Sequence, residues 1–255
     1  YGISDSILEK AAAATYAVRQ AERALVVVGK EWPDLTRHGE PRGTLRNAII
    51  ALNRLGFEFA HDLFRSRKTV EGHQIQQFQG DLSDDGCAVL RHMIIEEFNF
   101  DPGKENTREA ALTLAIERPF HPIRQYLDAL NWDGVPRLGN WLTDYLGAEA
   151  TPLNAAIGRI TLIAAVRRIR RPGAKFDTMM VLEGKQGSGK STAIRILAGS
   201  ENFSDQDMLA LDPKSQMEAL EGVWLYEIAE LEGISRADTT KVKACLLYTS
   251  DAADD

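Results

Sequence analysis

The sequence predicts the α/β fold class, with a mainly helical α+β region followed by a strand–loop–helix core. Three observations predict it. The chain has 255 residues, 44% hydrophobic and 26% charged, which is typical of a globular protein with room for more than one domain. Stretches with helical spacing alternate with short β-branched runs. A glycine-rich loop joins an apolar run to an amphipathic stretch between residues 176 and 197.

Composition excludes several classes of protein. No apolar run is longer than Leu162–Val166, which is far shorter than the roughly 18 residues that span a bilayer, so we expect no membrane partner. No secretory leader pattern opens the chain. The two cysteines, Cys87 and Cys245, cannot build a disulfide framework. A reducing, cytoplasmic location is the expectation.

Residues 31–120 are predicted to be an α+β region. Helices are expected over residues 45–52, from Ser83-Asp84 to about Phe98, and over residues 107–117. Aromatic and polar residues alternate over residues 57–64, which predicts a strand.

Residues 121–172 are predicted to be a helical region. Thr151-Pro152 supplies a capping residue and a first-turn proline. The helix that follows, Leu153–Arg170, is apolar on most faces, so we expect it to be buried. His121, before Pro122, is expected to be a structural hydrogen-bonding residue.

Residues 184–191 match G-x-x-x-x-G-K-[ST], the phosphate-binding P-loop, after a predicted strand over residues 176–182 and before a predicted helix over residues 192–197. Glycines let several backbone amides converge on one anion, and the helix adds a partial positive charge of about +0.5. The ammonium of Lys190 adds a full charge, and the hydroxyl of Ser191 is a Mg²⁺ ligand. The cofactors expected are ATP and Mg²⁺. The expected nucleotide-binding residues are Gly184, Lys185, Gln186, Gly187, Ser188, Gly189, Lys190, Ser191 and Thr192.

Some alternatives stay open for this loop. The plain alternative is a glycine turn that merely ends in Lys-Ser, although the full match between a strand and a helix argues against it. Lys185 alone can be a solvated side chain, and Thr192 can contribute only its backbone.

A second strand ending in an acid is predicted over residues 222–227. A nucleotide site needs a carboxylate at the end of a neighbouring strand. Glu227, nearest the strand end, is predicted to bind Mg²⁺, and Glu230 to act as the base that orients water. Together with Lys190 these acids are the predicted catalytic residues. The spacing does not decide between the two roles, and either acid can be an ordinary surface residue.

Motifs of other P-loop classes narrow the assignment. The sequence has no N-K-x-D segment of guanine-specific proteins and no L-S-G-G-Q signature of transporter ATPases. Small-molecule kinases rarely carry a helical region of this size before the loop, but a kinase function stays an open alternative.

The sequence resembles the virulence-associated protein E family through a combination of motifs that covers most of residues 30–244. These motifs are Trp32 with Gly39-Glu40-Pro41 and Leu45-Arg46-Asn47, His121-Pro122-Ile123-Arg124-Gln125-Tyr126-Leu127, Trp132-Asp133-Gly134-Val135-Pro136-Arg137-Leu138, Pro172-Gly173-Ala174-Lys175-Phe176-Asp177 and Trp224-Leu225-Tyr226-Glu227-Ile228-Ala229-Glu230-Leu231.

The resemblance implies an ATPase related to the AAA+ group and similar to superfamily 3 helicases, serving DNA replication of a phage or other mobile element. It implies DNA as a partner and a homo-oligomeric ring, a hexamer. Residues 184–191 match the family's Walker A loop, and Glu227 with Glu230 match its Walker B segment. The sensor residue and the arginine finger are expected beyond Ala244, so we expect this chain to show little ATPase activity.

The two ends of the chain are expected to be artificial. Residues 1–30 read as a truncated helical lead-in that starts without Met. Residues 245–255 read CLLYTSDAADD, which resembles a translated transposon-type sequencing adapter; the alternative is a natural polar tail. Without its three aspartates the net charge changes from −7 to −4. On this interpretation residues 173–244 are the N-terminal part of a P-loop ATPase domain.

A basic cluster ends the helix predicted over residues 153–170. Arg167, Arg168, Arg170 and Arg171 are the candidate DNA contacts. A solvated or subunit-facing helix end is the alternative, because the helix dipole favours arginine there. Two further functions stay open besides a DNA-stimulated motor: a non-motor ATP-dependent regulator and a P-loop kinase.

Overall fold

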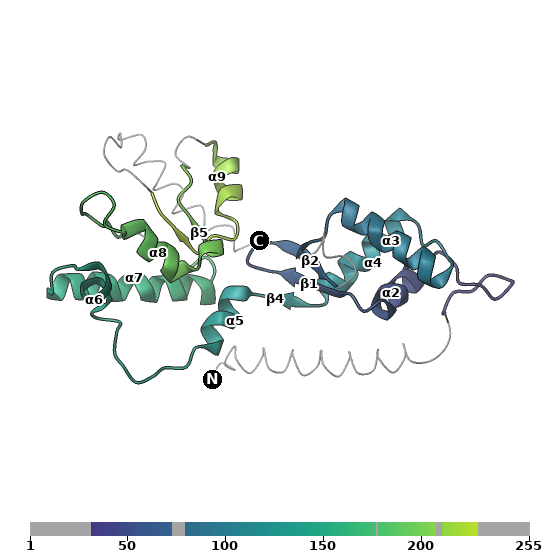
Figure 1. Cartoon of the computed structure of the whole chain (residues 1–255), viewed down its shortest axis with the longest axis horizontal. Helices are drawn as coiled ribbons and strands as arrows, with labels where there is room; N and C mark the ends of the chain where they lie inside the picture. The colour runs from purple at the N-terminus through teal and green to yellow at the C-terminus, as the bar shows by residue number, and fades with distance from the viewer. Residues whose placement is uncertain (1–31, 73–79, 177, 208–210, 229–255) are drawn as a thin grey trace. The chain divides into compact units, whose positions relative to one another are not determined.

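The computed structural model describes residues 32–72, 80–176, 178–207 and 211–228. These residues form a mixed α/β protein of two compact units (Figure 1). The described part of the first unit comprises residues 32–62, 67–72 and 80–120, and the second comprises residues 63–66 and the described residues from 121 onward. The predicted lead-in over residues 1–30 and the segment 245–255 lie outside the described residues.

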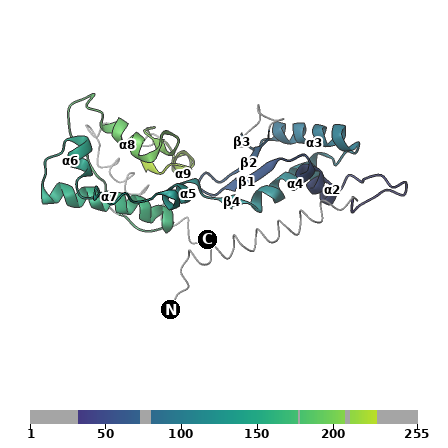
Figure 2. The same ribbon diagram turned by 60° about the horizontal axis from the view of Figure 1, so that its bottom comes forward.

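A four-stranded sheet organises the first unit (Figure 2). Its strands are β1 (Glu58–Asp62), β2 (Arg67–Glu71), β3 (Gly80–Asp81) and β4 (Pro119–Phe120). Their order is β3-β2-β1-β4, with antiparallel β1–β2 and β2–β3 pairs and a parallel β1–β4 pair. The predicted strand over residues 57–64 is confirmed in its central part.

Three helices accompany this sheet: α2 (Leu45–Arg54), α3 (Asp84–Phe98) and α4 (Lys104–Ile116). Helix α4 contacts β1, β2, α2 and α3, so it is the centre of the unit. The side chain of Ser83 caps α3 by accepting a hydrogen bond from the amide of Gly86, as the sequence predicts. Helix α4 begins three residues before the predicted residue 107, because Gly103 takes the N-cap position.

Among the described residues, a continuous hydrophobic core cluster lies in the first unit. Phe59 of β1 lies opposite Val70 of β2, and both side chains are buried. Alanines on α2 and α4 let the helices approach closely, while leucine, isoleucine and phenylalanine fill the space between them. The buried core residues are Ala48, Ala51, Leu52, Phe57, Phe59, Val70, Leu90, Ile94, Phe100, Ala110, Ala111, Leu114 and Ala115.

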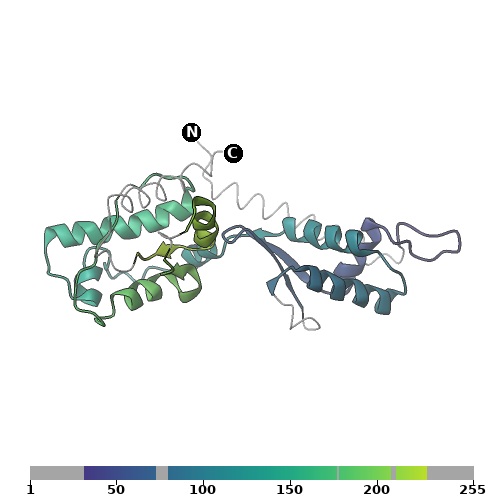
Figure 3. The same ribbon diagram turned by 90° about the horizontal axis from the view of Figure 1, so that it is seen from above.

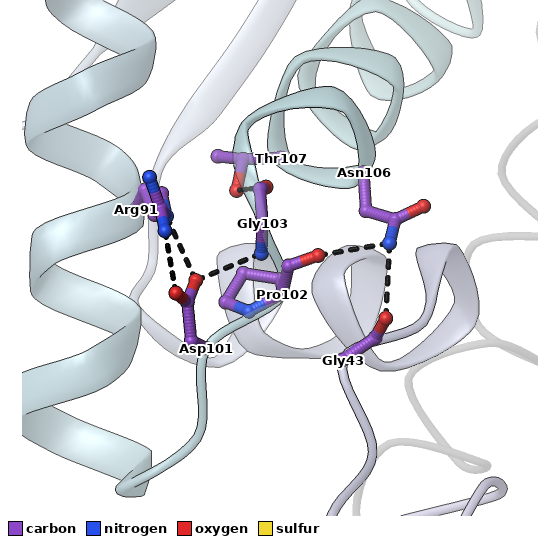
Figure 4. Close-up of polar contacts among 7 residues, drawn as sticks. All are labelled: Gly43, Arg91, Asp101, Pro102, Gly103, Asn106 and Thr107. Carbon is purple, nitrogen blue, oxygen red and sulfur yellow. Dashed lines mark hydrogen bonds and ion pairs between the residues drawn. The ribbon is translucent and has the colours of Figure 1, made fainter.

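Polar contacts hold the connection between α3 and α4 (Figure 4). The guanidinium of Arg91 donates two hydrogen bonds to the Asp101 carboxylate, one of them from Nε at 2.7 Å. The amide of Gly103 donates to the same carboxylate at 2.8 Å, and the side chain of Asn106 donates to the carbonyl of Gly43 at 3.0 Å. A Cβ on Gly43 would lie 2.3 Å from the Asp101 carbonyl oxygen. The chain therefore needs glycine at residue 43.

The second unit contains five α-helices and two short strands among its described residues (Figure 3). They are α5 (Pro122–Ala129), α6 (Trp141–Leu146), α7 (Pro152–Arg170), α8 (Lys190–Ala198), β5 (Phe203–Ser204), α9 (Pro213–Leu220) and β6 (Leu225–Tyr226), with a 3₁₀ turn, η2, at Ser200–Asn202. Strands β5 and β6 are parallel partners.

Three of these helices begin with the same local device, a capping residue followed by proline. His121, Thr151 and Asp212 accept hydrogen bonds from backbone amides of the first turns of α5, α7 and α9, respectively. Proline suits the first helical position because its missing N–H would have no partner there. The structural role expected for His121 and the cap expected at Thr151 are both confirmed.

Helix α7 has the predicted bounds, but the expectation that it is buried is wrong. Only Gly158 and Ile169 are buried along its length, whereas Leu153 and Ile160 are 68% and 52% exposed. Burial of a helix requires neighbours on each face. Helices α5 and α6 pack on α7, and together with the other described residues they leave much of it exposed. None of the described helices combines the length and the apolarity needed to cross a bilayer.

The strand predicted over residues 176–182 is also not found. No strand is assigned to residues 178–183, and Met179 and Val181 are about half exposed. A strand requires a ladder of hydrogen bonds to a neighbour. Within the described part of this unit, the paired strands are β5 and β6.

Candidate functional site

The glycine-rich loop, residues 184–189, leads directly into α8. Gly187 and Gly189 have φ angles of 76° and 83°, a left-handed conformation that glycine adopts without strain. The amide of Ser188 donates to the carbonyl of Lys185 at 3.2 Å, which closes a turn within the loop. The loop therefore curls back on itself, as the sequence predicts for residues 184–191.

The side chain of Lys190 lies against this loop. Its ammonium donates to the carbonyls of Gly184 and Lys185 at 2.8 and 3.0 Å and approaches the hydroxyl of Ser188 at 3.5 Å. The charge of the first residue of α8 is thus held beside the backbone that precedes it.

The N-terminus of α8 is open for an anion. Gly189 occupies the N-cap position, and no side chain of the described residues caps the helix. The amides of a first helical turn have no partners within the helix and carry a partial positive charge. Because residues 184–189 are exposed, this end of α8 can accept an anionic group from solvent.

Glu227 meets this helix from the end of β6. Its backbone amide donates to the carbonyl of Ser204 at 2.9 Å, which extends the pairing of β6 with β5 by one residue. The hydroxyl of Ser191 donates to Oε1 of Glu227 at 2.6 Å. Two residues 36 positions apart, both predicted as Mg²⁺ ligands, are thus brought together.

The chemistry of this pair fits a hard cation. Oε2 of Glu227 is buried, and no group among the described residues donates a hydrogen bond to it. Leaving a buried carboxylate oxygen without a partner is unfavourable. Hydroxyl and carboxylate oxygens are the ligands that Mg²⁺ prefers, so Ser191 and Glu227 are able to hold it.

Contacts around β5 support both elements of the site. Arg195 of α8 pairs with Asp205 at 2.9 Å, and its guanidinium lies 5.0 Å from the centre of the Phe203 ring. The hydroxyl of Tyr226 donates to the carbonyl of Gln206 at 2.6 Å. These contacts fasten α8 and β6 to β5 and to the two residues that follow it.

The remaining predicted site residues either have exposed side chains or lie outside the described residues. Lys185, Gln186 and Thr192 have exposed side chains. Glu230 lies outside the described residues, so its predicted role as a base stays a prediction.

Sequence reasoning missed Asn202, which is buried beside α8 and β5. Its amide donates to the carbonyl of Ala198 at 3.1 Å. The only sequence signal is a polar residue directly before the short strand that begins at Phe203, which by itself predicts no role.

The four candidate DNA-binding arginines lie at the C-terminal end of α7. All four are exposed, and Arg170 forms an ion pair with Asp128 that lowers the pKa of this carboxyl. Arg124 donates from Nε to the carbonyl of Ile169 at 3.1 Å and so satisfies one acceptor of the last turn. The charge of Arg170 is therefore engaged within the unit.

Helix α8 follows a glycine loop, has no side-chain cap among the described residues and meets the carboxylate of Glu227 at its first turn. These features form a candidate anion and metal site in a mixed α/β protein. Residues 127–254 match the virulence-associated protein E-like domain, which is half of the chain, and the chain belongs to this family. The match includes the loop, Ser191 and Glu227. Membership fits a protein of a phage or other mobile element. None of the curated proteins is significantly similar to the chain.

Proposed function

We propose that residues 184–192 bind ATP with Mg²⁺, and that the protein is an ATPase similar to superfamily 3 helicases, acting in DNA replication of a mobile element. The hydrogen bond between Ser191 and Glu227 carries the proposal. It joins the two residues that the sequence assigns to one metal, although they come from different elements. The P-loop match and the curled loop around Lys190 support it.

In this proposal each group has one task. The exposed loop amides and the first turn of α8 hold the phosphates, and Lys190 turns from the loop carbonyls to the outer phosphates. Ser191 and Glu227 hold Mg²⁺, which neutralises charge on the phosphate oxygens when it is bound. Glu230 is the base that orients the attacking water, and the sequence leaves open the reverse division of roles between Glu227 and Glu230.

Calorimetric titration of the chain with ATP and Mg²⁺ tests this function. We expect binding by the wild type and at least about tenfold weaker binding by Lys190→Ala, because a tenfold change is about 1.4 kcal/mol and a charged contact supplies this much. Lys214→Ala is the matched control, since Lys214 lies on α9 and is exposed. No binding by the wild type, or equal binding by Lys190→Ala, would refute the proposal.

DNA is the proposed partner of the arginine cluster at the end of α7. Replacing Arg167, Arg168 and Arg171 by Ala should weaken binding of single-stranded DNA. The slope of log affinity against log salt should fall by about 2, because each neutralised phosphate contributes roughly 0.7 to it. Replacing the exposed residues Arg37, Arg42 and Arg46 changes the net charge equally and is the control. Fluorescence anisotropy over a salt series measures both sets. Equal slopes for the two triple variants would place DNA elsewhere.

The oligomeric ring and the motor activity are parts of the same proposal. Light scattering with and without ATP and Mg²⁺ tests ring assembly, and DNA-stimulated phosphate release tests the motor. Both are measured on a full-length relative, because this chain itself is expected to show little ATPase activity. Binding without DNA-stimulated release would favour a non-motor regulator, and phosphate transfer to a small acceptor would favour a kinase.

A further inference from the structure

Asn202 joins three segments of the second unit. It is 7% exposed and ends η2, directly before β5. Its side-chain amide donates to the carbonyl of Ala198 at 3.1 Å, and its Oδ1 accepts from the guanidinium of Arg65 at 2.6 Å. Its own carbonyl accepts from the amide of Trp224 at 2.7 Å. One residue thus contacts α8, the approach to β6 and the loop over residues 63–66.

The first two of these segments carry the candidate metal ligands. Ser191 lies in the first turn of α8 and Ala198 is its last residue. At 1.5 Å per residue, about 10 Å of helix separates them. Trp224 is three residues before Glu227, along the segment that pairs with β5. Asn202 therefore holds the far ends of both elements whose near ends meet at Ser191 and Glu227.

Arg65 holds Asn202 in turn. Its guanidinium supplies the charged donor to Oδ1, and its stem lies against the backbone of Gly222, where a Cβ would come within 2.7 Å of the arginine Cγ. Its neighbour Phe64 packs on the ring of His121 at 5.3 Å between ring centres. Both Arg65 and the preceding Phe64 therefore anchor this loop.

We propose that Arg65 is a positioning residue for the Ser191–Glu227 pair and that it acts through Asn202. The inference rests on the proposed function, in which this pair holds the Mg²⁺ of ATP. Arg65 orients the Asn202 amide toward α8, and the Asn202 carbonyl holds β6, so the separation of the two metal ligands depends on a side chain more than 120 residues away in the sequence.

The metal dependence of ATP binding tests the inference. The dissociation constant of ATP is measured for the whole chain by calorimetry in Mg²⁺ and in EDTA, and the ratio of the two values is the metal enhancement. We expect Arg65→Ala to reduce this ratio about tenfold, as loss of a residue that orients metal ligands does, with little change in the value in EDTA. A merely structural role would lower the melting temperature without changing the ratio.

Three further variants complete the test. Arg67→Ala is the matched control, because Arg67 pairs with Asp81 in the first unit, and its ratio should equal that of the wild type. Asn202→Asp keeps the acceptor for Arg65 but removes the donor to Ala198, so its ratio should fall. Arg65→Lys keeps the charge and should give an intermediate metal enhancement. If Arg65→Ala does not fold, the ratio of Arg65→Lys tests the inference in its place.

The outcomes separate the two claims. If the wild type binds ATP with a metal enhancement that Arg65→Ala and Arg65→Lys both retain, the inference is overturned and the proposed function stands. If the wild type does not bind ATP with Mg²⁺, the proposed function fails and the inference fails with it.

Discussion

The two units are held together by different forces. The first unit has a continuous core in which α2, α3, α4 and the sheet bury alanine, leucine, isoleucine and phenylalanine side chains. In the second unit the buried hydrophobic residues are few among the described residues, and aliphatic side chains of α7 face solvent. Hydrogen bonds join its elements instead, from Asn202 to α8 and from Trp224 Nε1 to the carbonyl of Ala165 in α7.

This contrast indicates that apolar burial stabilises the first unit, whereas hydrogen bonds position the candidate site in the second. Burial of apolar area is the dominant favourable term in folding, so the first unit should respond most to core truncation. Directional hydrogen bonds contribute less to stability but determine where individual atoms lie. The second unit uses them where it carries the candidate site, so substitutions there should change ligand binding more than folding.

Truncation of the core should have the largest effect. Leu90→Ala in α3 removes a fully buried side chain and should lower the free energy of unfolding of the first unit by about 2–5 kcal/mol. Leu153→Ala in α7 of the second unit is the control, with an effect within about 0.5 kcal/mol because its side chain is 68% exposed. Urea unfolding followed by circular dichroism measures both. Similar losses in the two variants would contradict the contrast between the units.

Close backbone packing in the first unit should give the next largest effect. Gly43→Ala places a Cβ 2.3 Å from the Asp101 carbonyl oxygen, and this backbone must move. We expect a loss of about 1–3 kcal/mol, the usual range for overpacking. Asn106→Ala removes a donor to the Gly43 carbonyl without adding bulk, so it should cost less, about 1 kcal/mol. The order of the two losses in urea unfolding is the test, and a reversed order would show that the backbone yields easily at residue 43.

Substitution in the site of the second unit should change ligand binding more than stability. Glu227→Gln keeps an acceptor for Ser191 and removes a buried carboxylate, so stability should change by no more than about 1 kcal/mol. The metal enhancement of ATP binding should nevertheless fall at least about tenfold, because the amide is a poor substitute for a charged oxygen ligand. Calorimetry and thermal unfolding of the same samples compare the two effects. A large loss of stability with unchanged metal enhancement would make Glu227 a structural residue.

Acid should produce the smallest difference in stability between the units. In each unit the described residues include a carboxylate that is hydrogen-bonded to two nitrogens of an arginine. A hydrogen bond from Arg91 is the main cause that lowers the pKa of Asp101 from 3.8 to about 2, and one from Arg137 does the same for Asp133. Because both folded pKa values are depressed, both contributions are fully present above pH 3.8 and are lost as the pH falls toward 2.

The two carboxylates differ in what they join. Asp101 links α3 to the start of α4, so Asp101→Asn should slightly lower the stability of the first unit at pH 5 and flatten its decline toward pH 2. Asp133 pairs with Arg137 within one loop, so Asp133→Asn should change only the hydrogen exchange of residues 131–138. Exchange mass spectrometry at several pH values measures both. Spread of the Asp133→Asn effect over the second unit would indicate a larger role for this loop.

Local chemistry explains which features could be predicted from the sequence. The starts of α3, α7 and α9 follow from Ser83, Thr151 and Asp212, because a cap and its amide partner lie within three residues. The curl of the glycine loop is also local, since Gly187 and Gly189 themselves permit the required φ angles.

Only the tertiary structure decided the features that depend on distant partners. Apolar spacing in α7 could not show that its neighbours leave much of it exposed, and β-branched residues near Val181 could not supply a paired strand. The contact of Ser191 with Glu227 and the reach of Arg65 to Asn202 span 36 and 137 residues. Such contacts depend on how the chain closes over long loops, and no periodicity in the sequence encodes that closure.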